Sequence, residues 1–314
     1  MRLSVAMGPW IERSWLLELL VCPVCGQSLN RGADNYSCGR HTFPVVRGIP
    51  RFTPPSSYAD SFGFEWTSFP RLQLDAEESH ESADTFRQKT RLGPDDVAGK
   101  VVLDAGCGMG RFTDVVARWG GARVVGADIS RAVEAAAQNL VVFQSVGVVQ
   151  ADVRSLPFAP ESFDIVFSIG VLHHTPNTFQ SLARIARLVK PGGTLAVWVY
   201  SRRLRWTMLG SEVIRPLTSR MRPERLLRMV SWVTPRMREI KRRLPGAKPI
   251  LDFVLPTSNH PNPEWQILDT FDWYSPRYQR KHTYSEVEAW FRKLGFETVE
   301  RLGVPVAVRG RRPA

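Results

Sequence analysis

Short apolar segments alternate with segments of helical periodicity between residues 100 and 200. Continuous apolar runs of this kind, separated by helix-like stretches, are typical of parallel strands that are buried on both faces. The pattern predicts a parallel β-sheet with helices on both of its faces. The apolar segments are VVLDAG (101–106), VVGAD (124–128), VGVVQAD (146–152), FDIVFSIG (163–170) and TLAVWVY (194–200).

The C-terminal part of the chain adds a helix and two more strands to this pattern. Thr283 and Glu286 have the spacing of a capping box, and Gly295 is placed to end the helix that follows. The segments ETVERL (297–302) and VPVAVR (304–309) then predict two final strands.

Four potential metal ligands lie close together near the start of the chain. Cys22 and Cys25 are separated by two residues, as are Cys38 and His41, so each pair is able to bend around one tetrahedral ion. Three thiolates and one imidazole would saturate Zn²⁺ and leave no position for water, which predicts a structural rather than a catalytic zinc. We expect residues 1–55 to form a separate zinc-binding module.

Composition and charge narrow the class of protein. The 314 residues are 43% hydrophobic and 23% charged, which is the balance of a globular enzyme. Residues 201–250 hold fourteen Arg and Lys against three Glu, a net +11 out of +12 for the whole chain. Apolar residues at helical spacing predict two helices here, outside the sheet. This basic segment would suit RNA, an anionic membrane surface or a phosphorylated substrate, or it is simply a solvated helix face.

The apolar run 15–22 is too short to cross a bilayer, since Glu18 interrupts it and Pro23 follows it. It also has no signal-peptide cleavage pattern. We expect a cytoplasmic protein with no transmembrane segment.

A glycine-rich turn follows the first predicted strand of the sheet. Asp104, Gly106, Gly108 and Gly110 lie in DAGCGMG, where a ligand is able to approach the backbone. Asp128 ends the next strand and is well placed to accept hydrogen bonds from ribose hydroxyls. A dinucleotide fingerprint needs a glycine at position 111, which is Arg, so NAD is disfavoured.

The motifs DAGCGMGRF, VVGADIS, QADVRSLPF, FDIVFSIGVLHHTPN and LVKPGGTLAVWVY resemble those of class I S-adenosylmethionine-dependent methyltransferases of the methyltransferase type 11 group. The resemblance implies a Rossmann-like, seven-stranded, mostly parallel sheet and S-adenosylmethionine as the cofactor. It implies a role for each motif in turn. Asp104, Gly106, Gly108 and Gly110 would line the methionine part, Asp128 and Ile129 the ribose, Asp152 and Val153 the adenine, and Ile169, Gly170 and His173 the floor beneath the sulfonium. Asp152 has the alternative of capping a turn.

The N-terminal segments LLELLVCPVCGQSL and CGRHTFPVVRGIPRF resemble the zinc ribbon of methyltransferase activators. His41 stands where many members of that family carry a fourth cysteine. The resemblance implies a ribbon fold for this module.

Catalytic candidates lie in two segments. His173 and His174 end the fourth strand, where a base near the methyl group would assist a hydroxyl acceptor; capping of nearby backbone is the alternative. Tyr278 and His282, with Asp272 and Tyr274, lie in a second segment that is expected to form a wall of the acceptor pocket or a proline-ordered loop. Five aromatic residues are expected to close over the cofactor or to form a core between modules: Tyr58, Phe62, Phe64, Trp66 and Phe86.

Three functions remain open on the sequence. The favoured one is methylation, on oxygen or nitrogen, of a small-molecule or lipid- or glycan-linked acceptor by a catalytic domain over residues 56–314. Within it, residues 56–99 would cover the cofactor and residues 201–270 would be a basic helical insertion after the fifth strand, serving as a lid, a contact for RNA or a peripheral membrane contact. The alternatives are a ribosomal RNA base methyltransferase and a non-catalytic cofactor-binding adaptor.

Overall fold

The computed structural model describes residues 13–54, 58–76, 79–203 and 209–314. A seven-stranded sheet in the order β10-β11-β9-β8-β5-β6-β7 lies at its centre. The strands from β9 to β7 run parallel, and β11 is antiparallel to both of its neighbours. The predicted seven-stranded, mostly parallel sheet is therefore confirmed. Its strands are β5 (Val101–Ala105), β6 (Arg123–Asp128), β7 (Val146–Gln150), β8 (Phe163–Ile169), β9 (Val189–Trp198), β10 (Glu297–Arg301) and β11 (Ala307–Arg311).

Two hydrophobic cores cover the two faces of the sheet because successive strand residues point to opposite sides. Val102 of β5 packs into a core with α2, α4 and α5, and Leu103 packs into a core with α6 and α11. The flanking helices are α2 (Glu81–Thr90), α3 (Pro94–Val97), α4 (Arg111–Trp119), α5 (Ala132–Asn139), α6 (Thr178–Ala186) and α11 (Tyr284–Lys293). The 3-10 turn η2 (Leu172–His174) follows β8.

The N-terminal module is a small antiparallel sheet that follows a 3-10 helix. Its elements are η1 (Ser14–Leu19), β1 (Asn30–Arg31), β2 (Asn35–Ser37), β3 (Thr42–Val46) and β4 (Ile49–Pro50). Leu16 and Leu20 of this module are buried in the same core as the β5–β9 strands. The module therefore shares its core with the large sheet, because a segment this short is unable to bury a sufficient core of its own.

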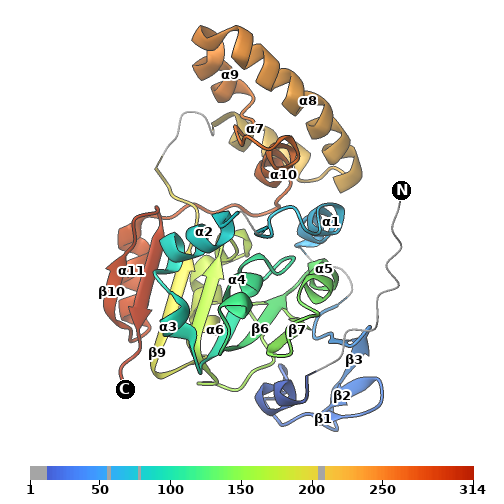
Figure 1. Ribbon diagram of the computed structural model, residues 1–314, viewed down its shortest axis with the longest axis vertical. Helices are drawn as coiled ribbons and strands as arrows, with labels where there is room; N and C mark the ends of the chain where they lie inside the picture. The colour runs from blue at the N-terminus through green and yellow to red at the C-terminus, as the bar shows by residue number, and fades with distance from the viewer. Residues whose placement is uncertain (1–12, 55–57, 77–78, 204–208) are drawn as a thin grey trace.

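The regular elements of the insertion after β9 are all helices within its described residues. It comprises α7 (Leu209–Thr218), α8 (Pro223–Arg243), η4 (Pro245–Ala247), α9 (Lys248–Val254) and α10 (Pro263–Tyr274). These helices gather at one end of the molecule and the N-terminal module lies toward the other end (Figure 1). The long α8 was expected as one of two helices; α9 and α10 complete the insertion.

Some sequence predictions lie outside the described residues, namely positions 1–12 and 55 of the N-terminal module, 56–57 and 77–78 of the expected cover over the cofactor, and 204–208 of the basic insertion. The described helices include none with the length and apolar character that a membrane span requires. The helix α1 (Asp60–Ser68) connects the module to the catalytic part and packs against α5.

One strand boundary differs from its prediction. β9 begins at Val189 rather than at Thr194, although Pro191 and Gly192 indicate a turn. The register between β8 and β9 shifts between Phe163 and Ile165, so this turn-like segment is accommodated as an irregularity in the ladder.

Candidate active site

A cavity of about 260 Å³ opens at the carboxyl ends of the parallel strands. Its wall includes Gly106 after β5, Asp128 at the end of β6, Ile169 at the end of β8 and Trp198 at the end of β9. The strand order reverses between β5 and β8, and open α/β sheets bind ligands at such a reversal. Helices α1 and α10 complete the wall from outside the sheet.

The glycine loop reaches this cavity through Gly106 and Gly108. Gly106 has φ +98°, and a Cβ there would lie 2.3 Å from Cγ2 of Val171. Gly108 has φ +54° and faces the indole of Trp66. Both positions therefore require a residue without a side chain.

Gly110 and Asp104 do not belong to the described cavity wall. Gly110 has φ +91° and precedes α4; a Cβ there would lie 2.8 Å from Cδ1 of Leu140, so its role is helix packing. Asp104 is buried and accepts a 2.7 Å hydrogen bond from Thr113. Burial raises the pKa of Asp104 to about 7.

Asp128 joins the glycine loop to the next turn. Its Oδ2 accepts a hydrogen bond from the Gly108 amide over 3.0 Å, and its Oδ1 accepts from the amide and hydroxyl of Ser130 over 2.8 and 2.7 Å. Burial raises the pKa of Asp128, and these hydrogen bonds oppose the rise. Asp128 and Ile129 both line the cavity.

Val153 lines the cavity, but Asp152 does not belong to the described wall. The Asp152 carboxylate accepts from the backbone and guanidinium of Arg154, with a shortest distance of 2.6 Å. This arrangement is the turn-capping alternative that the sequence left open for Asp152. Tyr58 lies beside it, with its hydroxyl 3.5 Å from Oδ1.

His174 lines the cavity, with Ile169 and Gly170 nearby on the same wall. Its Nδ1 lies 2.7 Å from the carbonyl oxygen of Tyr278. Because a carbonyl only accepts, Nδ1 carries the proton and Nε2 keeps a lone pair. Burial lowers the pKa of His174 to about 4, although the hydrogen bond to Tyr278 opposes this. The imidazole is thus neutral near pH 7 and is able to accept a proton.

His173 occupies a different environment. It is fully buried, stacks on Tyr200 with ring centroids 4.0 Å apart, and neither ring nitrogen has a hydrogen-bond partner. Burial lowers its pKa well below the ordinary value. It is not part of the described wall, whereas Ile169 and Gly170, which were expected beside it, are.

Tyr278 and His282 also lie outside the described wall of the cavity. Tyr278 acts through its carbonyl, which orients His174. His282 Nε2 lies 2.9 Å from Oγ1 of Thr178, and its backbone bonds to Tyr200 and Arg202. These contacts give His282 a structural place between β9 and α11.

Several charged residues in the cavity wall were missed by sequence reasoning. They are Glu65 of α1, Lys89 of α2, Arg111 of α4 and Asp269 of α10. Burial raises the pKa of Glu65 and raises that of Asp269 to about 6, and it lowers the pKa of Lys89 to about 7. Arg111 lies in the motif DAGCGMGRF, where it was considered only as the absence of a glycine. Glu65, Lys89 and Asp269 belong to no local motif, so only their burial, which the sequence does not display, would have identified them.

Asp272 was expected at the acceptor wall, and it does line the cavity. It accepts a 2.9 Å hydrogen bond from the hydroxyl of Tyr200, and burial raises its pKa to about 6. Tyr274, expected beside it, is buried instead, and its hydroxyl donates to the Pro256 carbonyl over 2.9 Å.

The expected aromatic cover divides into two groups. Tyr58, Phe62 and Trp66 line the cavity. Phe64 packs against Phe271 in the core of the insertion, and Phe86 is fully buried under the sheet. Three of these aromatics therefore lie where they could contact a ligand in the cavity, and the other two pack into hydrophobic cores.

The four predicted metal ligands converge. Ligand atoms of Cys22, Cys25, Cys38 and His41 all lie within 4.8 Å of one another. His41 Nδ1 is 3.5 Å from the sulfurs of both Cys22 and Cys38, and the Cys25 and Cys38 sulfurs are 3.7 Å apart. A tetrahedral ion with thiolates at ~2.3 Å separates its ligand atoms by about 3.8 Å, so the cluster fits such an ion.

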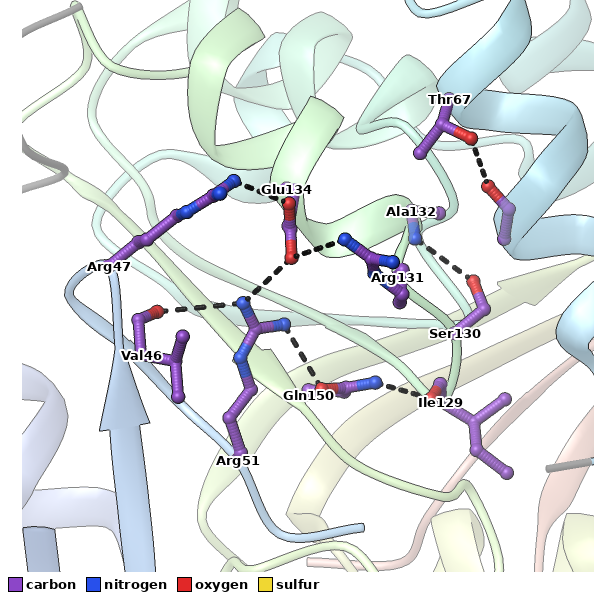
Figure 2. A network of polar contacts seen from close by, with 11 residues as sticks. Val46, Arg47, Arg51, Thr67, Ile129, Ser130, Arg131, Ala132, Glu134 and Gln150 are labelled. Atoms are coloured by element: carbon purple, nitrogen blue, oxygen red, sulfur yellow. Dashed lines mark hydrogen bonds and ion pairs between the residues drawn. The ribbon is translucent and has the colours of Figure 1, made fainter. Parts of the chain in front are cut away.

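The N-terminal module is connected to the segment after Asp128 by a chain of polar contacts (Figure 2). Arg51 Nη1 donates to Gln150 Oε1 over 3.0 Å, and Gln150 Nε2 donates to the Ile129 carbonyl over 2.9 Å. Arg51 also forms an ion pair with Glu134 of α5, which Arg47 contacts over 2.8 Å. The contacts run from the β3–β4 region to the segment that follows Asp128.

Part of the chain is similar to known methyltransferases. Residues 103–197 match the family model described as "Methyltransferase domain". The chain is 38% identical over 104 residues to methyltransferase GfsG of Streptomyces halstedii, covering 32% of this chain and 37% of the relative. It is 33% identical over 130 residues to the ubiquinone biosynthesis O-methyltransferase of Pseudomonas fluorescens (strain SBW25), covering 40% and 56%. A structure of an S-adenosylmethionine-dependent methyltransferase from Aquifex aeolicus aligns with a TM-score of 0.43 and 14% identity, over 82% of this chain and 97% of that one.

The matched segment contains the glycine loop, Asp128, Asp152 and His174. The similarity to methyltransferases is thus carried by this segment of the chain. The chain spans 37% and 56% of the length of the two curated relatives described above.

Proposed function

We propose that the protein transfers a methyl group from S-adenosylmethionine to a small-molecule or lipid- or glycan-linked acceptor, and that the accepting atom is a hydroxyl oxygen. The observation that carries this proposal is the single cavity that joins Gly106 and Asp128 to His174 and Tyr200. A relative in Pseudomonas fluorescens is an O-methyltransferase, which supports the choice of oxygen.

S-adenosylmethionine, when bound, supplies a methyl group activated by sulfonium. The protein then has to align the acceptor in line with that group and to exclude water. Gly106 and Gly108 would accommodate the methionine part, Asp128 and Ile129 the ribose, and Val153 the adenine. Tyr58, Phe62 and Trp66 would cover the ligand from α1 and the segment before it.

His174 would receive the proton of the acceptor hydroxyl at Nε2. Its neutral form and its fixed tautomer favour this role, because Nδ1 is held by the Tyr278 carbonyl. Asp272 and Tyr200 would contact the acceptor on the adjoining wall. His173, Tyr278 and His282 would serve as positioning residues.

We also propose that the Cys22, Cys25, Cys38 and His41 cluster holds one structural zinc ion. The ligand spacing and the set of three sulfurs and one nitrogen support zinc, and the four protein ligands leave no open position for a catalytic water. On this proposal the module spans residues 1–55 and the catalytic domain 56–314.

Incubation of the purified protein with methyl-labelled S-adenosylmethionine and fractionated cell extract tests the proposal. Label is expected in a small metabolite or a lipid fraction. His174→Asn should reduce turnover while calorimetry shows unchanged binding of S-adenosylhomocysteine, and His80→Asn, on an exposed residue, should change neither. Label in ribosomal RNA would support the RNA alternative, and tight cofactor binding without any transfer would support the adaptor alternative.

A further inference from the structure

The long helix α8 carries two apolar stripes whose centres lie about 90° apart around the helix axis, at 100° per residue. Leu226, Val230 and Met237 are buried and face the rest of the insertion. Met229, Trp232 and Ile240 form the second stripe beside them, where they are 43%, 60% and 41% exposed. A helix of a globular protein normally turns its apolar stripe to the core, so an exposed apolar stripe requires an explanation.

Cations lie on the same outward face. At 100° per residue, Arg225, Arg236 and Arg243 fall within about 30° of the centre of the exposed stripe. All three are exposed. Arg236 lies over the Trp232 ring at 4.1 Å from its centroid, and Arg243 pairs with Glu239 over 2.5 Å. The outward face therefore combines an aromatic ring, aliphatic side chains and a positive charge.

The helices next to α8 extend this character. Val213 and Leu217 of α7 are 79% and 72% exposed, and Ile250 of α9 is 68% exposed. Among the described residues, thirteen large hydrophobic side chains are exposed, and nine of them lie between 213 and 254. Exposed apolar surface concentrated in this way marks an interaction site more often than chance scatter does.

We propose that the outward face of α8, with the exposed apolar residues of α7 and α9, docks on an anionic lipid surface. Basic residues complement the negative charge of such a surface, and aliphatic side chains and a tryptophan enter the headgroup boundary. The arginines would also bind RNA phosphates, but RNA binding does not explain why the aliphatic side chains of Val213, Leu217 and Ile240 are exposed.

The position of the face has a consequence for the acceptor. Helix α8 packs against α10, which contributes Asp269 and Asp272 to the cavity wall. Docking through α8 would place this side of the cavity next to the lipid surface, where an acceptor with an apolar portion would be concentrated. Lipid docking itself does not depend on the methyl-transfer proposal, since it is measured without any acceptor.

Co-sedimentation with vesicles tests the proposal on the full chain. The probes are vesicles of phosphatidylcholine with phosphatidylglycerol, and vesicles of phosphatidylcholine alone. Binding is expected to the anionic vesicles and to weaken with added salt. Trp232→Glu should reduce binding at least tenfold, and a triple variant, Arg225→Gln, Arg236→Gln and Arg243→Gln, should reduce it by roughly fivefold for each cation removed.

Matched controls isolate the face from general effects of charge and apolarity. Val142→Glu changes an apolar residue that is 73% exposed near the sheet, and Arg184→Gln with Arg187→Gln and Arg292→Gln removes three exposed cations elsewhere. These controls should bind vesicles as the wild type does. S-adenosylhomocysteine binding should be unchanged in every variant, so a folding defect would be recognised.

Three results would overturn the proposal. One is the absence of binding to anionic vesicles at millimolar lipid. Another is a pair of observations: the protein binds a single-stranded RNA oligonucleotide through the three arginines, and Trp232→Glu binds anionic vesicles as well as the wild type does. The third is a dimer by gel filtration that Trp232→Glu dissociates, which would assign the face to a second copy of the chain.

Discussion

Arg51 of the N-terminal module and Gln150 at the end of β7 pair through both their side chains and their backbones. The Arg51 guanidinium donates to Gln150 Oε1 over 3.0 Å, and their backbones form a parallel bridge. Gln150 passes the contact on, since its Nε2 donates to the carbonyl of Ile129, which lines the cavity. The module thus supports the segment that is expected to hold the ribose.

Arg51→Met should weaken S-adenosylhomocysteine binding several-fold and lower the free energy of unfolding by about 1–3 kcal/mol, because buried hydrogen bonds are lost. Arg47→Met is the control: Arg47 contacts the same Glu134, but its side chain is 71% exposed, and such pairs contribute about 0–1 kcal/mol. Calorimetry and chemical denaturation measure both quantities. Equal effects of the two substitutions would show that Arg51 has no special role.

Asp128→Ala should lower the affinity for S-adenosylmethionine by roughly 1–3 kcal/mol, because charge-assisted hydrogen bonds to the ribose and to the Gly108 amide would be lost. Asp95→Ala, on an exposed residue of α3, should leave the affinity unchanged. Isothermal titration calorimetry is the measurement. Unchanged affinity for Asp128→Ala would place the ribose elsewhere.

Gly106→Ala should destabilise the glycine loop and abolish cofactor binding. The backbone of Gly106 is left-handed, which disfavours any residue with a side chain. The added Cβ would also lie 2.3 Å and 2.5 Å from the two methyl carbons of Val171. Gly246→Ala is the matched control, because its added Cβ meets nothing within 4 Å. Thermal denaturation with and without S-adenosylhomocysteine reports both effects, and a stable, cofactor-binding Gly106→Ala would contradict the loop geometry.

The pH dependence of turnover should reflect His174. In the free protein its pKa is lowered from 6.5 to about 4, so the base form is fully present above about pH 5, and the acid limb of kcat/KM should lie near pH 4 rather than near 6.5. Unfolded His174 binds a proton at higher pH than folded His174. Protonation of His174 therefore costs the folded protein no stability above pH 6.5. As the pH falls from 6.5 to 4, the free energy of unfolding should decrease by about 3 kcal/mol more in the wild type than in His174→Asn. Denaturation curves of both proteins across this range check the sign.

Metal analysis of protein purified without added zinc should give one equivalent per chain. His41→Ala should weaken metal binding and loosen the module before it reduces cofactor affinity, since His41 is one of four ligand positions. Cys107→Ala serves as the control because Cys107 lies in the glycine loop, outside the cluster. A metal content near zero in the wild type would refute the zinc proposal.

The sequence by itself determined the strands of the sheet and the segments that carry the chemistry. The strands β5 to β8 are recognisable because continuous apolar runs follow from burial on both faces, and Gly106, Asp128 and the four metal ligands lie in short motifs whose spacing is local. Gly110 shows the limit of such motifs, because its glycine is required by packing against Leu140 and not by the cavity.

Only the tertiary structure decided which candidates meet. His173 and His174 are neighbours in sequence and their ring centroids lie 4.1 Å apart, yet only His174 belongs to the described cavity wall, whereas His173 is fully buried behind it. Glu65, Lys89 and Asp269 come from α1, α2 and α10, and their altered pKa values arise from mutual burial of groups far apart in the chain. The outward stripe of α8 likewise contains apolar residues at helical spacing, as the buried stripe does. Packing against α10 decided which stripe is covered, because helical periodicity gives the relative positions of residues on a helix but not the neighbour that each face meets.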